Sequence, residues 1–224
     1  MNKKALFIGI GLLAIVALIA TVAIFQTEQT SQNENISGDS LSNNRDNNLN
    51  IVERANAPTK GPHDAKVTIV EFFDPACETC LVFYPLVNNL IKQYPGKVKV
   101  MMRYAPLHQG SDQVVKLLAA AHIQGQFWPA LEILFENQQR WTRHHVADPQ
   151  SAVALLTTLP LDNEQFIRDV NSDNISHIVR QDVEDGKMLK VRATPQFFVN
   201  GKPLVNFGHK PLIQLVEEAI DEVY

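Results

Sequence analysis

Cys77 and Cys80 are the only cysteines of this 224-residue chain, and they stand three positions apart. A β-branched and aromatic run over 66–73 precedes them and predicts a buried strand, whereas apolar residues recur at helical spacing over 77–94. The pair therefore lies at a strand-to-helix junction, where unpaired backbone N–H groups and the positive end of the helix dipole stabilise a thiolate. Because 45% of the residues are hydrophobic, the chain can bury a core without disulfide staples, and we interpret the pair as redox-active.

The remaining segments predict an α/β fold in which a sheet is split by helices. The run 97–104 predicts a second strand, so the chain forms a strand–helix–strand unit with a right-handed crossover and parallel pairing. Between about 106 and 190 the apolar residues recur at helical spacing, which predicts an all-helical insertion. A strand pattern returns over 195–205 with an Asn-Gly turn, the strongest short hairpin signal, and an amphipathic helix over 211–223 closes the chain.

Close to its N-terminus the chain has a long segment without a charged side chain. This segment, 5–25, contains 21 residues, enough to cross a hydrocarbon core of about 30 Å as a helix. Lys3 and Lys4 precede it and no Lys or Arg follows until Arg45, so the positive-inside rule places the N-terminus in the cytoplasm and the rest outside. We expect a single uncleaved transmembrane helix. A cleaved signal peptide is the alternative, and its core is typically shorter, about 7–15 residues; both interpretations export the domain to the periplasm or an equivalent extracytoplasmic space.

The segment 26–56 is the expected stalk between this anchor and the folded domain. As far as about residue 50 it consists mostly of Asn, Ser, Gln, Thr, Asp and Glu, and such a composition buries too little surface to offset its ordering entropy. The folded domain is expected to span 57–224. A net charge of -4 and the absence of a basic cluster exclude nucleic acid as the main partner.

Together these features resemble the DsbA-like thiol-disulfide oxidoreductases of the thioredoxin superfamily, over about 57–224. The resemblance implies a thioredoxin-like fold with an all-helical insertion, and no cofactor other than the redox-active disulfide between Cys77 and Cys80. It rests on five features: the strand ending Glu71-Phe72-Phe73, the Cys-Glu-Thr-Cys motif at 77–80, Pro85 five residues after the second cysteine, the insertion, and Thr194-Pro195 before the hairpin.

The resemblance also assigns roles to individual residues. Cys77 is similar to the exposed attacking nucleophile of the family, and Cys80 to the buried resolving cysteine. Glu71 resembles the buried acid that accepts the proton of the resolving cysteine, although an acid in a strand is otherwise most simply a strand-end residue that reaches solvent. Pro195 resembles the cis-proline that faces the disulfide. The substrate contacts expected beside the pair are Thr194, Glu78 and Thr79.

The two residues between the cysteines are expected to tune the pair. The strongest oxidants of the resembled family often carry a histidine before the second cysteine, and Thr79 occupies that position here. Glu78 adds a negative charge beside the thiolate. We therefore expect the Cys77 pKa to be lowered from about 8.5, but less than in histidine-containing relatives, and the disulfide to be less oxidising than theirs.

These observations predict an exported, membrane-tethered oxidoreductase that exchanges disulfides with protein substrates. An oxidase-like role is favoured, because dedicated isomerases of the superfamily usually add a dimerisation domain and the stalk offers none. The alternative is a reductase or isomerase that a membrane redox partner keeps reduced; in either case such a partner recycles the pair. A copper or zinc module is the remaining alternative, but two thiolates leave zinc two ligands short and the chain has only one adjacent histidine pair, His144-His145, so we expect no metal.

Overall fold

The computed structural model describes residues 51–224. The predicted membrane anchor at 5–25 and residues 26–50 of the predicted stalk lie outside the described residues. Among the helices of 51–224, none combines the length and the apolar character that crossing a membrane requires.

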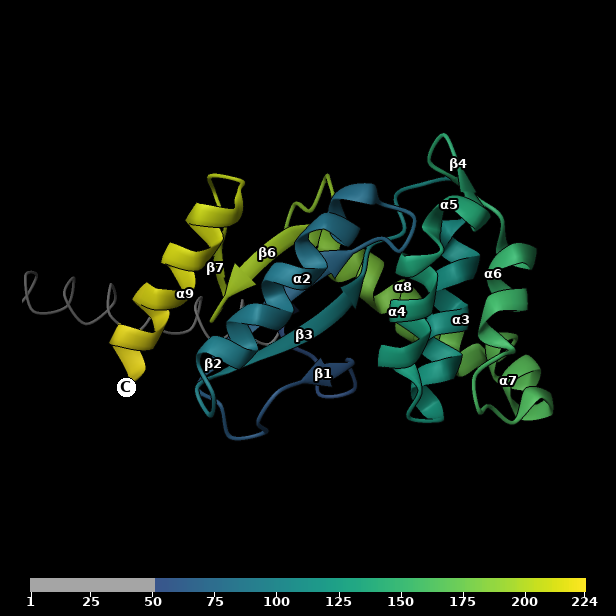
Figure 1. Ribbon diagram of the computed structural model, residues 1–224, viewed down its shortest axis with the longest axis horizontal. Helices are drawn as coiled ribbons and strands as arrows, with labels where there is room; N and C mark the ends of the chain where they lie inside the picture. The colour runs from purple at the N-terminus through teal and green to yellow at the C-terminus, as the bar shows by residue number, and fades with distance from the viewer. Residues whose placement is uncertain (1–50) are drawn as a thin grey trace, which may run out of the picture. The chain divides into compact units, whose positions relative to one another are not determined.

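A five-stranded sheet forms the centre of the domain (Figure 1). Its central strand β2 pairs in parallel with β3, which confirms the predicted strand–helix–strand unit, and antiparallel with β6. Strand β6 pairs antiparallel with β7, which confirms the predicted hairpin. All seven residues of β2 are buried, which explains why its sequence is a continuous apolar run rather than an alternating one. In spatial order the strands are β1 (Thr59–Lys60), β3 (Val98–Tyr104), β2 (Val67–Phe73), β6 (Gln196–Val199) and β7 (Lys202–Pro203).

Helices α2 (Glu78–Gln93) and α9 (His209–Val223) pack together with the sheet on one side, and α2 crosses in front of the strands in Figure 1. Successive side chains of β2 point to opposite faces, so Ile69 and Phe73 join the core beneath α2 and α9 whereas Phe72 joins a smaller cluster on the other face. By the same alternation, Glu71 lies on the face that α2 covers. This places the one acid of the strand beneath the helix that carries the cysteines.

The insertion between β3 and β6 forms a helical group beside the sheet (Figure 1). The prediction that it is all-helical is wrong in one detail, because β4 (Thr142–Arg143) and β5 (Val146–Ala147) form a short antiparallel hairpin. Its two turn residues are His144 and His145, with φ of 49° and 63°. The usual sequence signal for such a turn is Asn-Gly, which is absent here. The helices are α3 (Ser111–Ile123), α4 (Phe127–Glu136), α5 (Gln138–Trp141), α6 (Pro149–Leu156), α7 (Asn163–Val170) and α8 (Asp173–Met188).

Residues 51–56, which the sequence assigned to the stalk, belong to the folded domain. Val52 is fully buried in the smaller cluster, and the Arg54 guanidinium lies 2.8 Å from an Asp185 carboxylate oxygen of α8. Arg103 of β3 donates hydrogen bonds to the backbone carbonyls of Ile51 and Val52 at 2.8 and 2.6 Å. The predicted boundary was wrong because these contacts are made by partners far along the chain, which local composition does not reveal.

A buried ionic cluster joins β3 to α8. The Arg103 side chain is fully buried and donates from Nε to Asp182 Oδ1 at 2.8 Å and from Nη2 to Asp185. The other oxygen of Asp182 accepts the backbone N–H of Tyr104 at 2.8 Å. Burial raises the pKa of Asp182, and the positive charge of Arg103 opposes that rise. The cluster therefore fixes α8 against the end of the strand that runs beside β2.

Candidate active site

The two cysteines lie where β2 gives way to α2. Cys77 is the N-cap residue of α2, with extended backbone angles of φ -79° and ψ 119°, and Cys80 lies in the first turn of the helix. Cys80 is fully buried, whereas 6% of Cys77 is exposed. Both are free thiols. Cys77 is therefore the less buried of the two cysteines.

The environment of Cys77 favours its thiolate. Its pKa is lowered to about 5, chiefly by the hydrogen bond from the Cys80 side chain. Burial opposes this effect, while the Thr194 side chain and the backbone N–H groups of Cys80 and Thr79 add to it. Backbone donors at the start of α2 thus act on the sulfur as the junction geometry predicts. At neutral pH Cys77 is the charged member of the pair.

Cys80 and Glu71 are shifted in the opposite direction. Burial raises the Cys80 pKa well above its usual value, and the hydrogen bond to Cys77 and the negative charge of Glu71 raise it further. Burial also raises the pKa of Glu71 to about 8, with a smaller contribution from the Cys77 charge. One carboxyl oxygen of Glu71 is buried and has no hydrogen-bond partner among residues 51–224. At neutral pH the site therefore holds a thiolate, a thiol and a carboxylic acid.

The loop before β6 lies against the pair from the other side. The Thr194–Pro195 peptide bond is cis, and the Cys77 sulfur lies 3.2 Å from the Thr194 carbonyl oxygen, to which it donates when it is protonated. The structure thus brings Thr194 and its neighbour Pro195 next to the cysteines. The remaining two predicted residues lie in the first turn of α2, where the Glu78 side chain is exposed and Thr79 is half-buried.

Asp74 is a buried residue of the site that we did not predict. Its side chain is fully buried, and its Oδ1 accepts the backbone N–H of Ala76 at 2.9 Å. Its Oδ2 accepts the backbone N–H groups of Leu107 and His108 at 2.7 and 2.9 Å and the Ser111 hydroxyl at 2.9 Å. The His108 ring nitrogen Nδ1 lies 2.8 Å from the same oxygen. The Asp-Pro step after the strand is the available signal, because Asp side chains often bind nearby backbone N–H groups in turns.

Gln138 is a second buried polar residue of the site that we did not predict, and it comes from the insertion. It is 3% exposed, and its side-chain Nε2 donates to the carbonyl oxygens of Pro75 and Cys77 at 2.9 and 3.1 Å. Gln138 lies 61 residues after Cys77 in the chain, so no local pattern connects the two.

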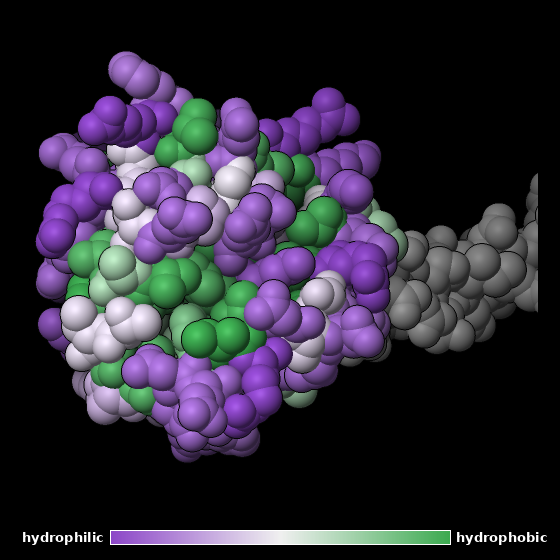
Figure 2. Space-filling model, turned by 90° about the vertical axis from the view of Figure 1, so that its right-hand side faces the viewer, coloured by the Kyte–Doolittle hydropathy of each residue, from purple (hydrophilic) through white to green (hydrophobic). Residues whose placement is uncertain are grey.

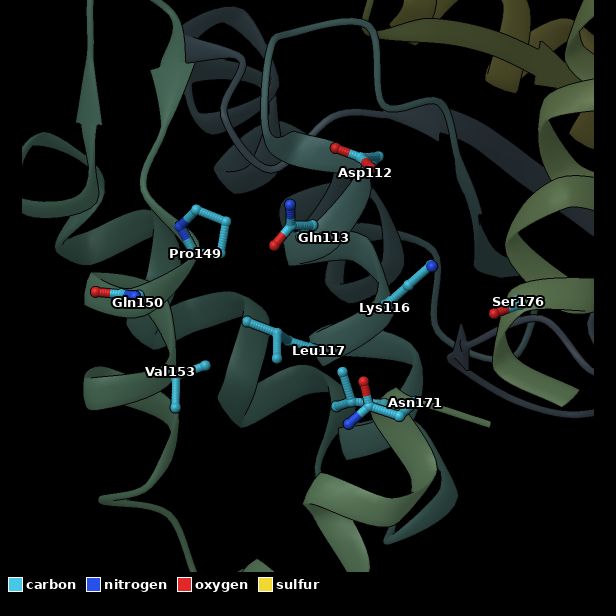
Figure 3. A pocket seen from close by; sticks show the side chains of 10 residues that line it. Asp112, Gln113, Lys116, Leu117, Pro149, Gln150, Val153, Asn171 and Ser176 are labelled. Carbon is cyan, nitrogen blue, oxygen red and sulfur yellow. The ribbon is translucent and has the colours of Figure 1, made fainter. Parts of the chain in front are cut away.

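A pocket of about 540 Å³ lies between α3, α6 and the end of α7 (Figure 3). Its lining includes Gln113 and Lys116 of α3 and Gln150 of α6, and none of its lining residues belongs to the cysteine turn. On the face of the domain shown in Figure 2, apolar residues gather in patches between polar ones. Val146 and Ile167 are exposed apolar side chains of the insertion. No group of three or more His, Cys, Asp or Glu side chains within 51–224 is arranged to hold a metal ion.

Comparison with known proteins places this geometry in a family. The family model described as Thioredoxin matches residues 53–221. The chain is 29% identical over 169 residues to the probable disulfide bond formation protein D of Bacillus anthracis, covering 72% of this chain and 76% of that protein. It is also 30% identical over 145 residues to the Na(+)/H(+) antiporter NhaA of Herminiimonas arsenicoxydans, covering 65% of this chain but only 22% of the antiporter. The match to the antiporter is thus confined to about a fifth of its length.

Solved structures share the fold. The crystal structure of oxidised BdbD from Bacillus subtilis superposes with a TM-score of 0.65 and 26% identity, covering 74% of this chain and 94% of that one. A thioredoxin-like oxidoreductase from Silicibacter pomeroyi DSS-3 superposes with a TM-score of 0.66 and 23% identity, covering 78% and 97%. Since the family model spans the strands, the insertion and the closing helix together, this chain belongs to the thioredoxin family.

Proposed function

We propose that this chain is a protein thiol-disulfide oxidoreductase that exchanges disulfides with protein substrates through Cys77 and Cys80. The observation that carries the proposal is the difference between the two thiols: Cys77 is slightly exposed with a pKa lowered to about 5, whereas Cys80 is fully buried with a raised pKa. Cys77 attacks or leaves readily as a thiolate, and Cys80 forms the intramolecular disulfide with it. The similarity to a probable disulfide bond formation protein and to BdbD supports this assignment.

In the oxidising direction, the exchange has two steps. A substrate thiolate attacks the Cys77 sulfur of the Cys77–Cys80 disulfide, so that a substrate–Cys77 disulfide forms and Cys80 leaves and takes a proton from Glu71. A second substrate thiolate then attacks the substrate sulfur of this mixed disulfide, and Cys77 leaves as a stable thiolate. The substrate gains a disulfide and loses two electrons, and the cysteine pair accepts both.

We assign the oxidase-like direction because a low thiolate pKa stabilises the reduced pair and makes the disulfide a stronger oxidant. The alternative is a reductase or isomerase that a partner keeps reduced. The proposal includes tethering through the uncharged segment 5–25, an extracytoplasmic location and recycling by a membrane redox partner; the length and flanking charges of that segment support it. Thr194, Glu78 and Thr79 are the proposed substrate contacts beside Cys77.

The direct test uses the purified, oxidised protein and a reduced dithiol peptide in the presence of a metal chelator. We expect each protein molecule to transfer one disulfide to peptide and to emerge with two free thiols, counted by alkylation and mass spectrometry. Lack of transfer, or transfer that requires added metal, would contradict the proposal. Alkylation trapping in cells then decides the direction, because an oxidase is held mostly as the disulfide and a reductase or isomerase mostly as the dithiol.

Glu71 is proposed to move the proton of Cys80, donating it when Cys80 leaves and accepting it when Cys80 attacks. The change Glu71→Gln keeps the shape but removes the transferable proton, and we expect the first oxidising step to slow by about 10- to 100-fold. Burial, the chief cause of the raised Glu71 pKa, persists in the oxidised protein, whereas the Cys77 charge that adds to the rise is absent there. The ratio of wild-type to variant rate should therefore fall as the pH rises through the Glu71 pKa of the oxidised protein, which lies below the value of about 8 in the reduced protein. Rapid-quench measurement of the mixed disulfide provides both rates. A pH-independent ratio near one would remove Glu71 from the mechanism.

A further inference from the structure

We infer that Gln138 is a positioning residue for the redox pair: from the helical insertion, it holds the turn that carries Cys77 and thereby controls how readily that sulfur reacts. The inference deepens the proposed function and rests on it, because it takes Cys77 to be the attacking group. The Gln138 side chain hydrogen-bonds to backbone carbonyls and to neither cysteine sulfur. Gln138 acts through the backbone around Cys77.

The contacts of Gln138 fix two peptide groups near the nucleophile. The carbonyl of Pro75 belongs to the peptide between residues 75 and 76, and the carbonyl of Cys77 belongs to the peptide between residues 77 and 78. One amide group donates to both oxygens, at 2.9 and 3.1 Å. Since each peptide is planar, binding its carbonyl also fixes the direction of its N–H group. A rotation of either peptide would break one of these bonds.

Asp74, Gln138 and Leu81 together restrain the three peptides from residue 75 to residue 78. The peptide between 75 and 76 is held at its oxygen by Gln138 and at its nitrogen by the Asp74 side chain. The next peptide is held through the Cys77 N–H, which donates to the Asp74 backbone carbonyl at 3.0 Å. The peptide after Cys77 is held by Gln138 and by the Leu81 N–H at 3.3 Å. The first turn of α2 is thus oriented from outside the helix.

The start of α2 lacks the side-chain cap that usually orients the first turn of a helix. Helices usually begin with Ser, Thr, Asp, Asn or Gly, whose side chains or backbone suit the N-cap position. Here the N-cap residue is Cys77, and no side chain at the cap accepts a conventional capping hydrogen bond. The N–H groups of Thr79 and Cys80 stabilise the Cys77 sulfur instead. Their aim depends on the orientation of the turn, because a hydrogen bond weakens steeply when its angle is poor.

A purely structural role for Gln138 and a positioning role predict different results. If Gln138 only fills space and satisfies polar atoms, its loss lowers the stability of the fold but leaves the Cys77 sulfur as it was. If it positions the turn, its loss also misaligns the N–H groups that stabilise the thiolate. The pKa of Cys77 and the equilibrium with glutathione then change as well.

The test compares Gln138→Met with the neighbouring change Asn137→Ala. Methionine has a similar length but no N–H donor. Asn137 is the control because its side-chain amide donates to the Ile133 carbonyl of the preceding helix and accepts from Arg140, and it has no hydrogen bond to the cysteine turn. The pKa of Cys77 is read in the reduced proteins from thiolate ultraviolet absorbance, after circular dichroism confirms that each variant is folded.

We expect the Cys77 pKa to rise by about one unit in Gln138→Met, a roughly tenfold loss of thiolate at acidic pH, and to stay at the wild-type value in Asn137→Ala. The glutathione equilibrium should shift toward the disulfide in the first variant only. If Gln138→Met does not fold, Gln138→Asn, which keeps the amide but withdraws it by one methylene, takes its place with the same expected direction. A folded Gln138 variant that titrates like the wild type would overturn the inference, whereas absence of disulfide transfer by the wild-type protein would overturn the proposed function alone.

Discussion

Replacement of Cys77 by serine is expected to abolish disulfide exchange, whereas replacement of Cys80 by serine is expected to trap the substrate on the protein. A serine hydroxyl does not form the sulfur nucleophile that exchange requires, and in Cys77→Ser the remaining thiol is fully buried with a raised pKa. In Cys80→Ser the accessible Cys77 still attacks a substrate disulfide. The resulting mixed disulfide persists, because no second thiol of the protein resolves it.

The measurement is a non-reducing gel after incubation with a disulfide-containing substrate protein. A band at the summed mass should appear with Cys80→Ser, disappear on reduction, and be absent with Cys77→Ser. The wild type is the control and should show the adduct only transiently. Adduct formation by Cys77→Ser at the rate of Cys80→Ser would show that Cys80 is reachable and that the proposed order of attack is wrong.

The second large effect is expected on stability, from Arg103→Met. Arg103 is fully buried and pairs with Asp182 and Asp185. Its removal leaves the buried Asp182 carboxylate without this opposite charge, whereas Asp185 keeps its ion pair with Arg54. Breaking a buried ion pair by removing one partner typically costs about 3–5 kcal/mol of unfolding free energy. The loss should be smaller at acidic pH, because Asp182, whose pKa burial already raises, takes up a proton more readily once the positive charge is gone.

Urea denaturation at neutral and acidic pH measures this prediction. The control is Arg168→Met, which removes the cation of an exposed pair with Glu164 at 3.7 Å. Exposed ion pairs are screened by water and contribute little, so this variant should unfold close to the wild-type midpoint. Equal destabilisation by the two variants would show that burial of the Arg103 cluster is not what makes it important.

Much of the fold follows from local patterns in the chain. The buried run of β2, the helical spacing of α2 and the Asn200-Gly201 turn each report a backbone preference that the final structure keeps. The cysteine pair was found for the same reason, since its position between a strand and a helix is a local property. The alternation of β2 also explains how Glu71 comes to lie beneath α2.

What could not be predicted depends on partners that are distant in sequence. Gln138 reaches the carbonyls of Pro75 and Cys77 across more than sixty residues, and its own helix has only four residues. In the sequence, Arg103 is a single charged residue in a predicted strand, and nothing nearby indicates that it is buried. Its burial is explained by the two α8 carboxylates that it binds, those of Asp182 and Asp185. The hairpin at 142–147 was missed because histidines occupy its turn. For Gln138 and Arg103 tertiary packing decides the environment of the side chain, whereas the hairpin is a local element without the usual turn residues.

The hydrogen bonds from Arg103 to the carbonyls of Ile51 and Val52 have a practical consequence for truncation. A recombinant domain that started at residue 57, the boundary suggested by composition, would lack both acceptors, the buried Val52 side chain and the Arg54 ion pair. The Arg103 guanidinium would still bind Asp182 and Asp185, but the N–H groups that donate to Ile51 and Val52 would lose their acceptors. The apolar cluster that Val52 completes on the sheet would be exposed to water. Soluble preparations of this domain should therefore begin at or before Ile51.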